Sequence, residues 1–521
     1  MLIFDGGLRG RGGEHLRGRW PWLAVILVVL LALAVRLPYL WSYPLATVEW
    51  DEVRIGYGIA FQHLHPSTDY SRDIGPLYNY LIGGLFRLFG PDLRIPRVVS
   101  MLSSVGTVLL TYLIGLKAFG RRSGLLAAAA LALSGASVYL AHEGFSDSLT
   151  PLMVSVASLL TLEAERKSPW WLAPAGLAWG VALQTDSSVF AFLIPLLIYL
   201  ILRAGRRILP TLLGLAAFLL GYANMILTNI RQPLVSLHWI FAHKTYATGG
   251  PHGLLPILGH YAYEILSFGQ SLGSAYLAHW PSPADIGVGF VVLVWMVLFV
   301  DAVRHLWREG SSPLTLFLVL GPLLLMPLFN RAFLFPQLSR YFVPVLPWAL
   351  SMMAHRAEDL ARHLRERGLS PRVTGACALV LAGILPLASL VTDEVSATSS
   401  QQTSVQIFAL ADRARSLAPA GTPLYVDSTA PLARYFDSML AAEGFRISLM
   451  GDPWANNENG FFDAAAWSRV LGTAPRPFLA VLGAPSFQKV ALHLPPSASS
   501  ARIRGLRGGY VIVRVGRTQG G

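Results

Sequence analysis

Charged residues are scarce in this sequence. Only 13% of the 521 residues are Asp, Glu, Lys or Arg, whereas soluble globular proteins contain about 25%. Hydrophobic residues make up 54% of the chain, and the mean hydropathy is +0.51. These values exclude a disordered chain, a fibrous repeat and an ordinary soluble enzyme. They predict a polytopic α-helical membrane protein.

Cysteine and acidic residues are also few. The single cysteine, Cys377, excludes an intrachain disulfide, so cysteine usage says nothing about the redox compartment. Lys and Arg number 41 against 29 Asp and Glu, which gives a net charge of +12. In a membrane protein such an excess marks cytoplasmic loops. We therefore expect no nucleic-acid partner.

Long apolar runs recur along the chain, and each is long enough to cross a hydrocarbon layer of about 30 Å. A cleaved signal peptide is an alternative for the first run, because Ala32-Leu33-Ala34 is similar to a cleavage site. The run continues nearly to Trp41, which favours an uncleaved span. We expect about eleven transmembrane helices, at residues 21–41, 95–117, 123–141, 148–164, 170–185, 188–204, 208–228, 286–306, 313–330, 341–356 and 372–392.

The distribution of basic residues supports this topology, because cytoplasmic loops are enriched in Lys and Arg. With the N-terminus in the cytoplasm, the short outer turns at 142–147 and 184–188 contain neither residue. An odd number of crossings then places the C-terminal tail outside. The expected cytoplasmic turns contain Lys117, Arg121, Arg122, Arg166, Lys167, Arg203, Arg206, Arg207, Arg304, Arg308, Arg356, Arg362, Arg365, Arg367 and Arg372.

Two long loops, 42–94 and 229–285, lie on the expected outer face. Segments 53–64 and 76–90 of the first loop have apolar residues at helical spacing, which predicts interfacial helices. A second membrane crossing at 76–90 is an alternative, but it would be short and would invert the charge bias that follows.

The tail differs in composition from the rest of the chain. Three runs have the composition of strands, and two segments have helical periodicity. Residues 397–521 are therefore expected to form a small soluble α/β domain outside the membrane, after a transmembrane domain at 1–396. The strands are expected at Leu424–Val426, Phe478–Leu482 and Tyr510–Val515, and the helices at 404–417 and 429–442.

Acidic residues follow the first span and lie between the third and fourth. Adjacent carboxylates such as Asp51 and Glu52 would raise one another's pKa, which suits a general base. For this pair taken alone, a solvated helix start is the favoured explanation. His142, Glu143 and Asp147 lie in a very short outer turn, where Asp147 could simply cap the fourth span. Two acidic clusters on one face favour an active site.

Arginines at the outer ends of spans are candidates for binding a phosphate. Arg340 and Tyr341 begin the tenth span, and a guanidinium there either extends to lipid headgroups or binds a phosphate through two hydrogen bonds. Arg72, Arg54 and Lys244 could act similarly. Five histidines in the second long loop fit no standard metal-ligand spacing, and aromatic-belt packing explains them better. They are His238, His243, His252, His260 and His279.

In chain order, these features resemble the GT-C glycosyltransferases, in the branch that contains protein O-mannosyltransferases and the lipid A aminoarabinose transferase. The resemblance covers roughly residues 20–360, and the tail resembles the C-terminal domain of the aminoarabinose-transferase-like members. The residues that carry it are Asp51-Glu52, Gly75-Pro76-Leu77-Tyr78-Asn79-Tyr80, Phe89-Gly90, Arg94-Ile95-Pro96-Arg97, Phe119-Gly120-Arg121-Arg122-Ser123-Gly124, His142-Glu143 through Asp147, and Arg340-Tyr341-Phe342-Val343-Pro344.

The resemblance implies an outer-face active site and a polyprenyl-phosphate-linked sugar donor. It implies that Asp51 is the catalytic carboxylate, that Glu52 and Asp147 accompany it, and that Arg340 lies near the donor phosphate. Many relatives have a lysine where this chain has Ile74 or Asp186, which leaves the donor undetermined. We assign Tyr341, Arg72, Arg54 and Lys244 to the donor phosphate as well, and His142, Glu143 and Tyr78 to substrate binding.

The expected function is transfer of a hexosyl or pentosyl group to a hydroxyl of a glycan, lipid or protein acceptor, with inversion. The expected location is the bacterial plasma membrane. No cofactor is required, and no ligand spacing indicates a divalent metal, although some relatives bind one. A transporter is one alternative, but transporters usually bind substrate at the bilayer midplane within internal repeats. A non-catalytic binder of lipid-linked glycans is the other.

Overall fold

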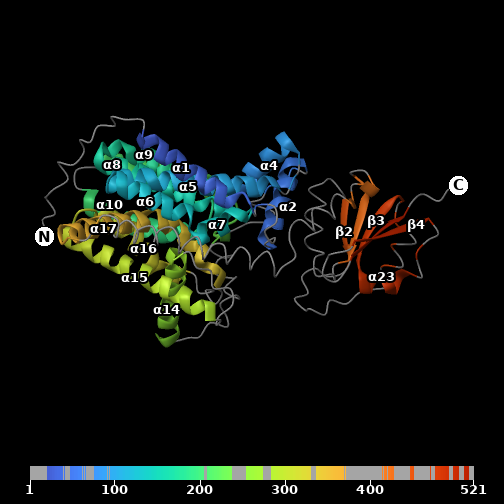
Figure 1. Cartoon of the computed structure of the whole chain (residues 1–521). Helices are drawn as coiled ribbons and strands as arrows, with labels where there is room; N and C mark the ends of the chain where they lie inside the picture. Colours follow the sequence, from blue (N-terminus) through green and yellow to red (C-terminus); the bar gives the residue numbers. More distant parts are fainter. Residues whose placement is uncertain are drawn as a thin grey trace.

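The protein is described from a computed structural model, which contains a helical part and a β-sheet (Figure 1). The described residues are 20–368, except 39, 41–46, 62, 64, 66–74, 91, 93, 205–207, 237–253, 274–282 and 330–335, and then 370, 413–414, 416–418, 421–427, 446–450, 467, 470, 474, 476–491, 494, 497–503 and 510–515.

The helical part is built from segments rich in Leu, Ala and Val. Leu and Ala are strong helix formers, and proline or glycine stands at many of the helix ends. In chain order the helices are α1 (Trp20–Arg36), α2 (Thr47–Phe61), α4 (Leu77–Phe89), α5 (Arg94–Ala118), α6 (Arg121–Ala132), α7 (Gly135–His142), η1 (Ser146–Ser148), α8 (Thr150–Arg166), η2 (Pro169–Trp171), α9 (Leu172–Leu183), η3 (Ser187–Val189), α10 (Phe190–Ala204), α11 (Ile208–Gly221), α12 (Ala223–Arg231), α14 (Leu254–Gly273), α15 (Pro283–Glu309), α16 (Pro313–Phe329), η5 (Pro336–Val345) and α17 (Leu346–Glu366).

The first ten expected spans each coincide with a helix or a bent pair of helices, and the eleventh, 372–392, lies outside the described residues. By length and apolar composition, one helix in the described part, α5, is sufficient to cross a membrane. Two bent pairs, α6 with α7 and α11 with α12, would raise that number to three. The count of about eleven therefore stays a prediction.

The tenth expected span requires a correction. Residues 336–345 form the 3₁₀ helix η5, and the α-helix that follows, α17, begins at Leu346 and continues to Glu366. The arginines assigned to a cytoplasmic turn after residue 356 therefore lie mostly on helix α17. The apolar run ends at 356, but the Ala, Leu, Arg and Glu residues beyond it are all good helix formers, so the helix continues.

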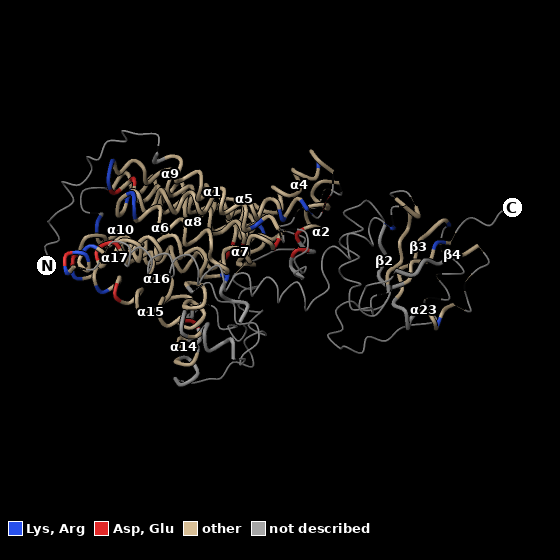
Figure 2. The backbone as a smooth tube through the Cα atoms, in the orientation of Figure 1, with Lys and Arg blue, Asp and Glu red and all other residues tan. Residues whose placement is uncertain are grey.

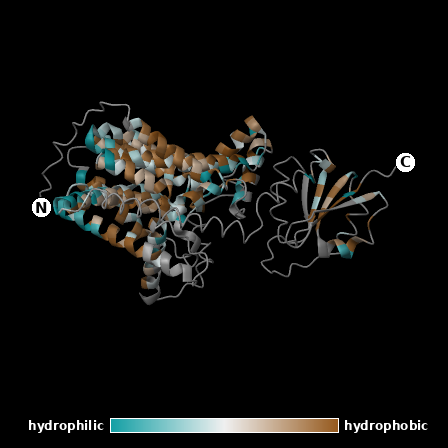
Figure 3. Cartoon of the chain, viewed as in Figure 1, coloured by the Kyte–Doolittle hydropathy of each residue, from teal (hydrophilic) through white to brown (hydrophobic). Residues whose placement is uncertain are grey.

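The surface of the helical part is apolar, and its charges gather toward the ends. Brown, hydrophobic ribbon covers most of the bundle in Figure 3, and many large apolar side chains are exposed, such as Leu27, Leu202 and Leu220. Lys, Arg, Asp and Glu concentrate near the end where α17 stops and around α2 and α7 (Figure 2). This distribution is typical of a surface surrounded by lipid tails.

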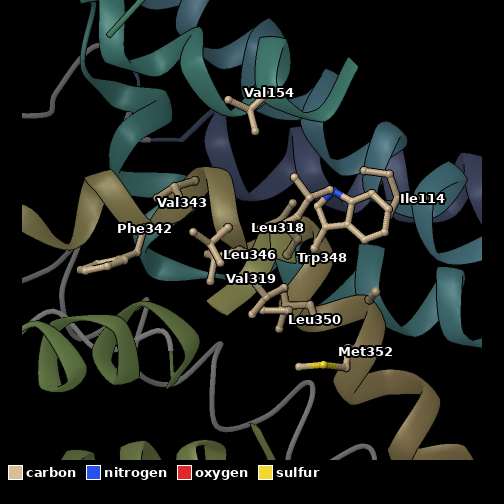
Figure 4. Packing of buried hydrophobic residues seen from close by; sticks show 14 of the residues in the cluster. Ile114, Val154, Leu318, Val319, Phe342, Val343, Leu346, Trp348, Leu350 and Met352 are labelled. Carbon is tan, nitrogen blue, oxygen red and sulfur yellow. The ribbon is translucent and has the colours of Figure 1, made fainter. Parts of the chain in front are cut away.

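The first residues of α17 lie in the centre of the helical core. Trp348 is buried among Ile114, Leu318 and Leu346 (Figure 4). Its indole Nε1 donates a hydrogen bond to Ser158 Oγ at 2.8 Å, so the one polar atom of the ring is satisfied. This packing fixes the position of η5, which immediately precedes α17.

Both segments of the first long loop that were predicted to be helices are helical. The first, α2, begins at Thr47 and therefore includes the acidic residues that the sequence placed before it. The second, α4, buries one face, including Tyr78 and Asn79. The two helices approach closely at Gly56 and Gly83, where an added Cβ would lie under 3 Å from Ile82 and Ile59 side-chain atoms.

The described part of the tail contains a five-stranded sheet of order β2-β1-β3-β5-β4, with β2, β1 and β3 parallel and β5 and β4 antiparallel. Its core contains Trp467, Phe478 and Val513. The three predicted strands correspond to β1, β3 and β5. The expected helices 404–417 and 429–442 lie mostly outside the described residues. The elements are β1 (Pro423–Asp427), β2 (Arg446–Met450), β3 (Phe478–Gly483), α23 (Ala484–Val490), β4 (Ala498–Ile503) and β5 (Tyr510–Val515).

Candidate functional site

Helix α2 is fixed to α5 by a buried ion pair. Arg97 donates from Nε to Glu49 Oε1 at 2.9 Å and from its terminal nitrogen to Glu49 Oε2 at 3.0 Å. Both side chains are at most 1% exposed. The same Oε1 accepts the Gly144 backbone N–H at 2.6 Å. One carboxylate thus connects the first outer loop to α5 and to the turn after α7.

Glu52, one helical turn after Glu49, makes a second connection. Its Oε2 accepts a hydrogen bond from Asn79 Nδ2 of α4. Its Oε1 accepts the Ser146 backbone N–H at 3.3 Å, and Glu52 is 8% exposed. These contacts bring the acidic residues of α2 next to the 142–147 turn, which supports the expectation that the two acidic clusters share one face.

The capping alternative for the 142–147 turn is wrong. Residues 146–148 form the separate 3₁₀ turn η1, and α8 begins at Thr150 with Leu149 at its N-cap and no side-chain capping bond. The Asp147 side chain is instead directed to an arginine far along the chain.

Arg340 is that arginine. Its Nε lies 3.2 Å from Asp147 Oδ2, and its guanidinium carbon lies 4.9 Å from the Phe145 ring centre and 5.0 Å from the Tyr341 ring centre. A terminal nitrogen also donates to the Tyr341 hydroxyl at 3.2 Å. Only 20% of the side chain is exposed, so Arg340 pairs within the protein and does not extend to lipid headgroups.

Several carboxyl groups of this site hold their protons more tightly than usual. Burial and the neighbouring Asp186 carboxylate raise the pKa of Asp147 well above its ordinary value, although Arg340 acts in the opposite direction. Burial raises the pKa of Glu143 to about 7. Burial disfavours the Arg340 cation, but Asp147, Tyr341 and Glu143 outweigh it and the pKa of Arg340 is raised. The charged guanidinium of Arg340 therefore lies beside two carboxyl groups, those of Glu143 and Asp147, whose pKa values are raised.

His142 and Tyr78 are both buried at the base of the site. His142 Nε2 lies 2.8 Å from the backbone oxygen of Arg36, at the end of α1. The Tyr78 hydroxyl donates to the Pro96 backbone oxygen at 3.3 Å. Burial and Glu52 raise the pKa of Tyr78 well above its usual value. Both side chains stabilise the surrounding elements in this structure, and their predicted contacts with substrate stay predictions.

Four of the predicted site residues cannot be placed. Asp51 and Arg54 belong to α2, but their side chains lie outside the described residues, as do Arg72 and Lys244 entirely. The described residues therefore bring together Glu52, Glu143, Asp147, Arg340 and Tyr341, with His142 and Tyr78 beneath them. The catalytic role of Asp51 stays a prediction.

Sequence reasoning missed two participants. Asp186, in the short turn between α9 and η3, accepts the Ser188 N–H at 2.6 Å and interacts electrostatically with Asp147. Asp186 stands where many relatives have a lysine. The sequence was therefore interpreted as lacking a cation at this position, and the carboxylate that Asp186 adds was overlooked. The Glu49–Arg97 pair was also missed, although an arginine beside a proline at the start of α5 is a signal of a fixed contact.

Comparisons with known proteins find one family model and several solved structures that are similar to this chain. A family model described as dolichyl-phosphate-mannose-protein mannosyltransferase matches residues 73–228. A search of curated proteins finds no match. Among solved structures, apo ArnT from Cupriavidus metallidurans matches with a TM-score of 0.61 and 16% identity, covering 94% of this chain and 97% of that one.

Two further structures show the same fold. ArnT from the same organism bound to undecaprenyl phosphate has a TM-score of 0.60 and 16% identity, covering 97% of this chain and all of that one. The apo oligosaccharyltransferase of Archaeoglobus fulgidus has a TM-score of 0.55 and 12% identity, covering 92% of this chain and 72% of that one. These matches confirm the predicted resemblance at the level of the fold: the chain has the helical fold of these membrane proteins.

Proposed function

We propose that this protein is a membrane glycosyltransferase that moves a sugar from a polyprenyl-phosphate donor to an acceptor hydroxyl on the outer face of a bacterial plasma membrane. The family model and the GT-C fold support the reaction class. The solved ArnT structure with undecaprenyl phosphate and an AglB structure with a dolichol-phosphate support a lipid phosphate as the carrier.

The observation that carries the proposal is the environment of Arg340. Its guanidinium is mostly buried and packs against Phe145, and its Nε is paired with Asp147. Because burial and Asp186 favour protonation of Asp147, the pair can take up a proton and leave the guanidinium to an incoming anion. An arginine in such a setting binds phosphate strongly, since both of its edges carry parallel N–H donors.

The proposed reaction is one direct displacement. Asp51 accepts the proton of the acceptor hydroxyl while that oxygen bonds to the anomeric carbon, on the face opposite the phosphate. The bond from the anomeric carbon to the phosphate oxygen breaks, and the configuration inverts. A general base of this kind contributes about 10²–10⁴ in rate. Arg340 stabilises the charge that develops on the leaving lipid phosphate.

The remaining residues position these two. Glu52 holds α2 against α4 and against the Ser146 N–H, which fixes the backbone that carries Asp51. Tyr341 orients Arg340 through its hydroxyl. Because no nucleotide diphosphate leaves, the mechanism does not call for a metal or another cofactor. The acceptor is a glycan, a lipid or a protein hydroxyl, and the donor sugar is a hexose or a pentose.

The test combines binding with transfer. Full-length protein in nanodiscs would be assayed for binding of undecaprenyl phosphate and for release of that lipid from labelled polyprenyl-phosphate sugars. Asp51→Asn should bind the lipid like wild type and lose transfer by at least a hundredfold. Arg340→Ala should weaken lipid binding, while Arg356→Ala, which breaks a pair with Asp301 on α15, should not.

Three outcomes would contradict the proposal. Transfer by Asp51→Asn at the wild-type rate would exclude that residue as the base. Movement of an intact labelled donor across the bilayer, without cleavage of its phosphate bond, would favour the transporter. Binding of donor without transfer to any glycan, lipid or peptide acceptor would favour the non-catalytic binder.

A further inference from the structure

Two helices of the bundle carry the same pair of residue types at the same spacing. Helix α15 has His305 followed by Glu309, and α17 has His355 followed by Asp359. Residues four apart lie on the same face of a helix. Each helix therefore presents an imidazole and a carboxylate side by side, and α15 packs against α17.

His305, His355 and Asp359 converge on one point, and Glu309 contacts His305 beside it. His305 Nε2 lies 3.1 Å from Glu309 Oε1 and 3.3 Å from Asp359 Oδ2, and His355 Nε2 lies 3.7 Å from the same Oδ2. One ligand atom from each of His305, His355 and Asp359 lies within 4.8 Å of the others. Among the described residues, this is the group of His and carboxylate side chains that comes close enough to hold an ion.

Hydrogen bonds satisfy this group of atoms only weakly. A neutral imidazole has one N–H, so His305 Nε2 would share a single proton between Glu309 and Asp359, and His355 Nε2 approaches the same Asp359 oxygen. A metal ion at the centre would be bound by all of these atoms together. Tetrahedral Zn²⁺ with bonds of about 2.0–2.1 Å to nitrogen and oxygen separates its ligand atoms by roughly 3.3–3.4 Å, and the three measured separations bracket that value.

Neighbouring residues orient the ligands as they do in metal sites. Arg362 contacts the other oxygen of Asp359, Oδ1, at 3.4 Å, which leaves Oδ2 directed to the two histidines. The Phe119 ring stacks on His355 with centres 5.1 Å apart. Such outer contacts commonly fix the direction of ligand side chains. The two histidines and Asp359 are 20–22% exposed, so an ion can reach them from solvent.

The cluster is separate from the candidate transfer site. Helix α17 starts directly after η5, which carries Arg340, and Asp359 is the fourteenth residue of that helix. At 1.5 Å per residue the cluster is about 20 Å from the start of the helix. It lies toward the end of the bundle where basic residues gather (Figure 2), so a metal there cannot contact the sugar or its phosphate.

We propose that His305, His355, Asp359 and Glu309 bind one divalent transition-metal ion, with Zn²⁺ the best match, and that this ion fastens α15 to α17. Two imidazoles and two carboxylates are ligands that Zn²⁺ accepts in tetrahedral geometry. The two carboxylates balance the charge of the ion. Because Trp348 lies on α17 and η5 directly precedes that helix, the ion would stabilise the scaffold that holds Arg340 without entering the chemistry.

The test measures metal directly. Tag-free, full-length protein in detergent would be stripped with a chelator, dialysed, and titrated with Zn²⁺, and bound metal would be determined by elemental analysis. Co²⁺ substitution would add a visible absorption band typical of tetrahedral coordination. We expect about one ion per chain, and a melting temperature that rises with Zn²⁺ and falls after chelation.

Matched variants separate this site from adventitious binding. His305→Ala with His355→Ala should lose the ion, the Co²⁺ band and the Zn²⁺-dependent rise in melting temperature. His363→Ala, on the same helix but 55% exposed and 3.9 Å from Glu366, should keep all three. If the double variant does not fold, Glu309→Gln with Asp359→Asn serves instead.

Two results would overturn the proposal. One is wild-type protein that binds less than a tenth of an ion per chain at micromolar Zn²⁺. The other is a double variant that retains the ion and the Co²⁺ band, which would place the metal elsewhere. In either case His305 and His355 connect the helices only through hydrogen bonds and ion pairs.

Discussion

At the scale of single residues, Arg340 illustrates how the partners of a side chain decide its role. The sequence allowed both lipid headgroups and a substrate phosphate as its partner. The structure adds a third partner, Asp147, together with the ring of Phe145. A buried ion pair carries a desolvation cost that the attraction between its charges only partly offsets, and removal of one partner leaves the other charge uncompensated. Because burial and Asp186 raise the pKa of Asp147, protonation of that carboxyl would release the guanidinium to an anion.

Asp147 should therefore affect donor binding less than Arg340 does. Asp147→Asn replaces the carboxylate paired with Arg340 Nε by a neutral amide of similar shape and keeps the cation. Because a neutral side chain at 147 imitates the protonated carboxyl, we expect donor affinity to be unchanged or higher, whereas Arg340→Ala removes a charged hydrogen bond worth about 1.5–3 kcal/mol, or about 10–150-fold. Titration of nanodisc-embedded protein with labelled undecaprenyl phosphate measures both. Weaker binding by Asp147→Asn would show that the carboxylate, and not its protonated form, holds the guanidinium ready for the anion.

Glu264 makes stability depend on pH. It lies on α14, outside the expected spans, and is 3% exposed. Neither of its carboxylate oxygens has a hydrogen-bond partner among the described residues. Burial raises its pKa to about 8 from 4.5. The folded protein thus binds a proton that the unfolded chain releases, so this contribution to stability is full below about pH 4.5 and lost as the pH rises through 8.

Glu264→Gln should remove that dependence. We expect the melting temperature of the wild type to fall between pH 5 and pH 9 more steeply than that of the variant, with the variant more stable at pH 9. Glu366→Gln is the control, because Glu366 is 66% exposed and its substitution should leave the slope unchanged. Parallel slopes for wild type and Glu264→Gln would mean that Glu264 is solvated in the folded protein.

Residue contacts of this kind were only partly predictable. The sequence shows the adjacent acids Asp51 and Glu52 after the first expected span and Arg340 before the tenth. The predicted topology placed all three on the same side of the membrane. The contact between Asp147 and Asp186 was not predictable, because it depends on how the ends of α9 and η1 approach. The sequence shows a histidine four residues before an acid on both α15 and α17. The sequence does not show that the two helices pack together and bring these pairs into contact.

At the scale of elements, the Glu49–Arg97 pair fastens the helix that carries Asp51. Helix α2 is short and contains Gly56 and Gly58, so its own propensity does not hold it in place. Its orientation depends on contacts with α4 and α5, of which this ion pair is the most buried. Removing one partner of a buried pair leaves the other charge without compensation.

Arg97→Ala should therefore destabilise the helical part strongly. Breaking a buried pair costs about 3–5 kcal/mol, and we expect a loss of that size in a denaturant titration of the protein in mixed micelles. Arg94 lies one turn before Arg97 on α5 and forms an exposed pair with Asp92 at 3.9 Å. Arg94→Ala removes that pair, and exposed pairs are worth about 0–1 kcal/mol. Equal losses for the two variants would contradict the proposed fastening of α2 by Arg97.

Helix positions were the most predictable part of the fold. Apart from the tenth, the expected spans that fall on described residues lie within a few residues of helices, because burial and lipid exposure both require apolar side chains there. The error at α17 arose because helical propensity continues after hydropathy ends. The bend between α6 and α7, 54° at Leu133 and Ser134, carries no proline, but Ser134 and Gly135 stand there, and Gly/Ser pairs are a known cause of kinks. The apolar run passes through this pair without interruption, so hydropathy alone predicted one continuous helix.

At the scale of the whole molecule, the helical part and the sheet have separate cores. One apolar cluster contains the residues around Trp348, and another contains Trp467, Phe478 and Val513. In the part of the tail that the structure describes, the five strands form one sheet and pair with one another. A segment that buries its own apolar residues in this way is expected to fold without the rest of the chain.

A fragment of residues 397–521 should accordingly be soluble and unfold cooperatively. Circular dichroism of the purified fragment should show mixed strand and helix signal and a single thermal transition. Val513→Asp, which places a charge in the middle of the core, should abolish that transition, whereas Arg514→Asp, exposed on the same strand, should leave it nearly unchanged. A fragment that stays unfolded while the full-length chain is folded would show that the sheet needs the helical part, and the domain boundary at 397 would then be wrong.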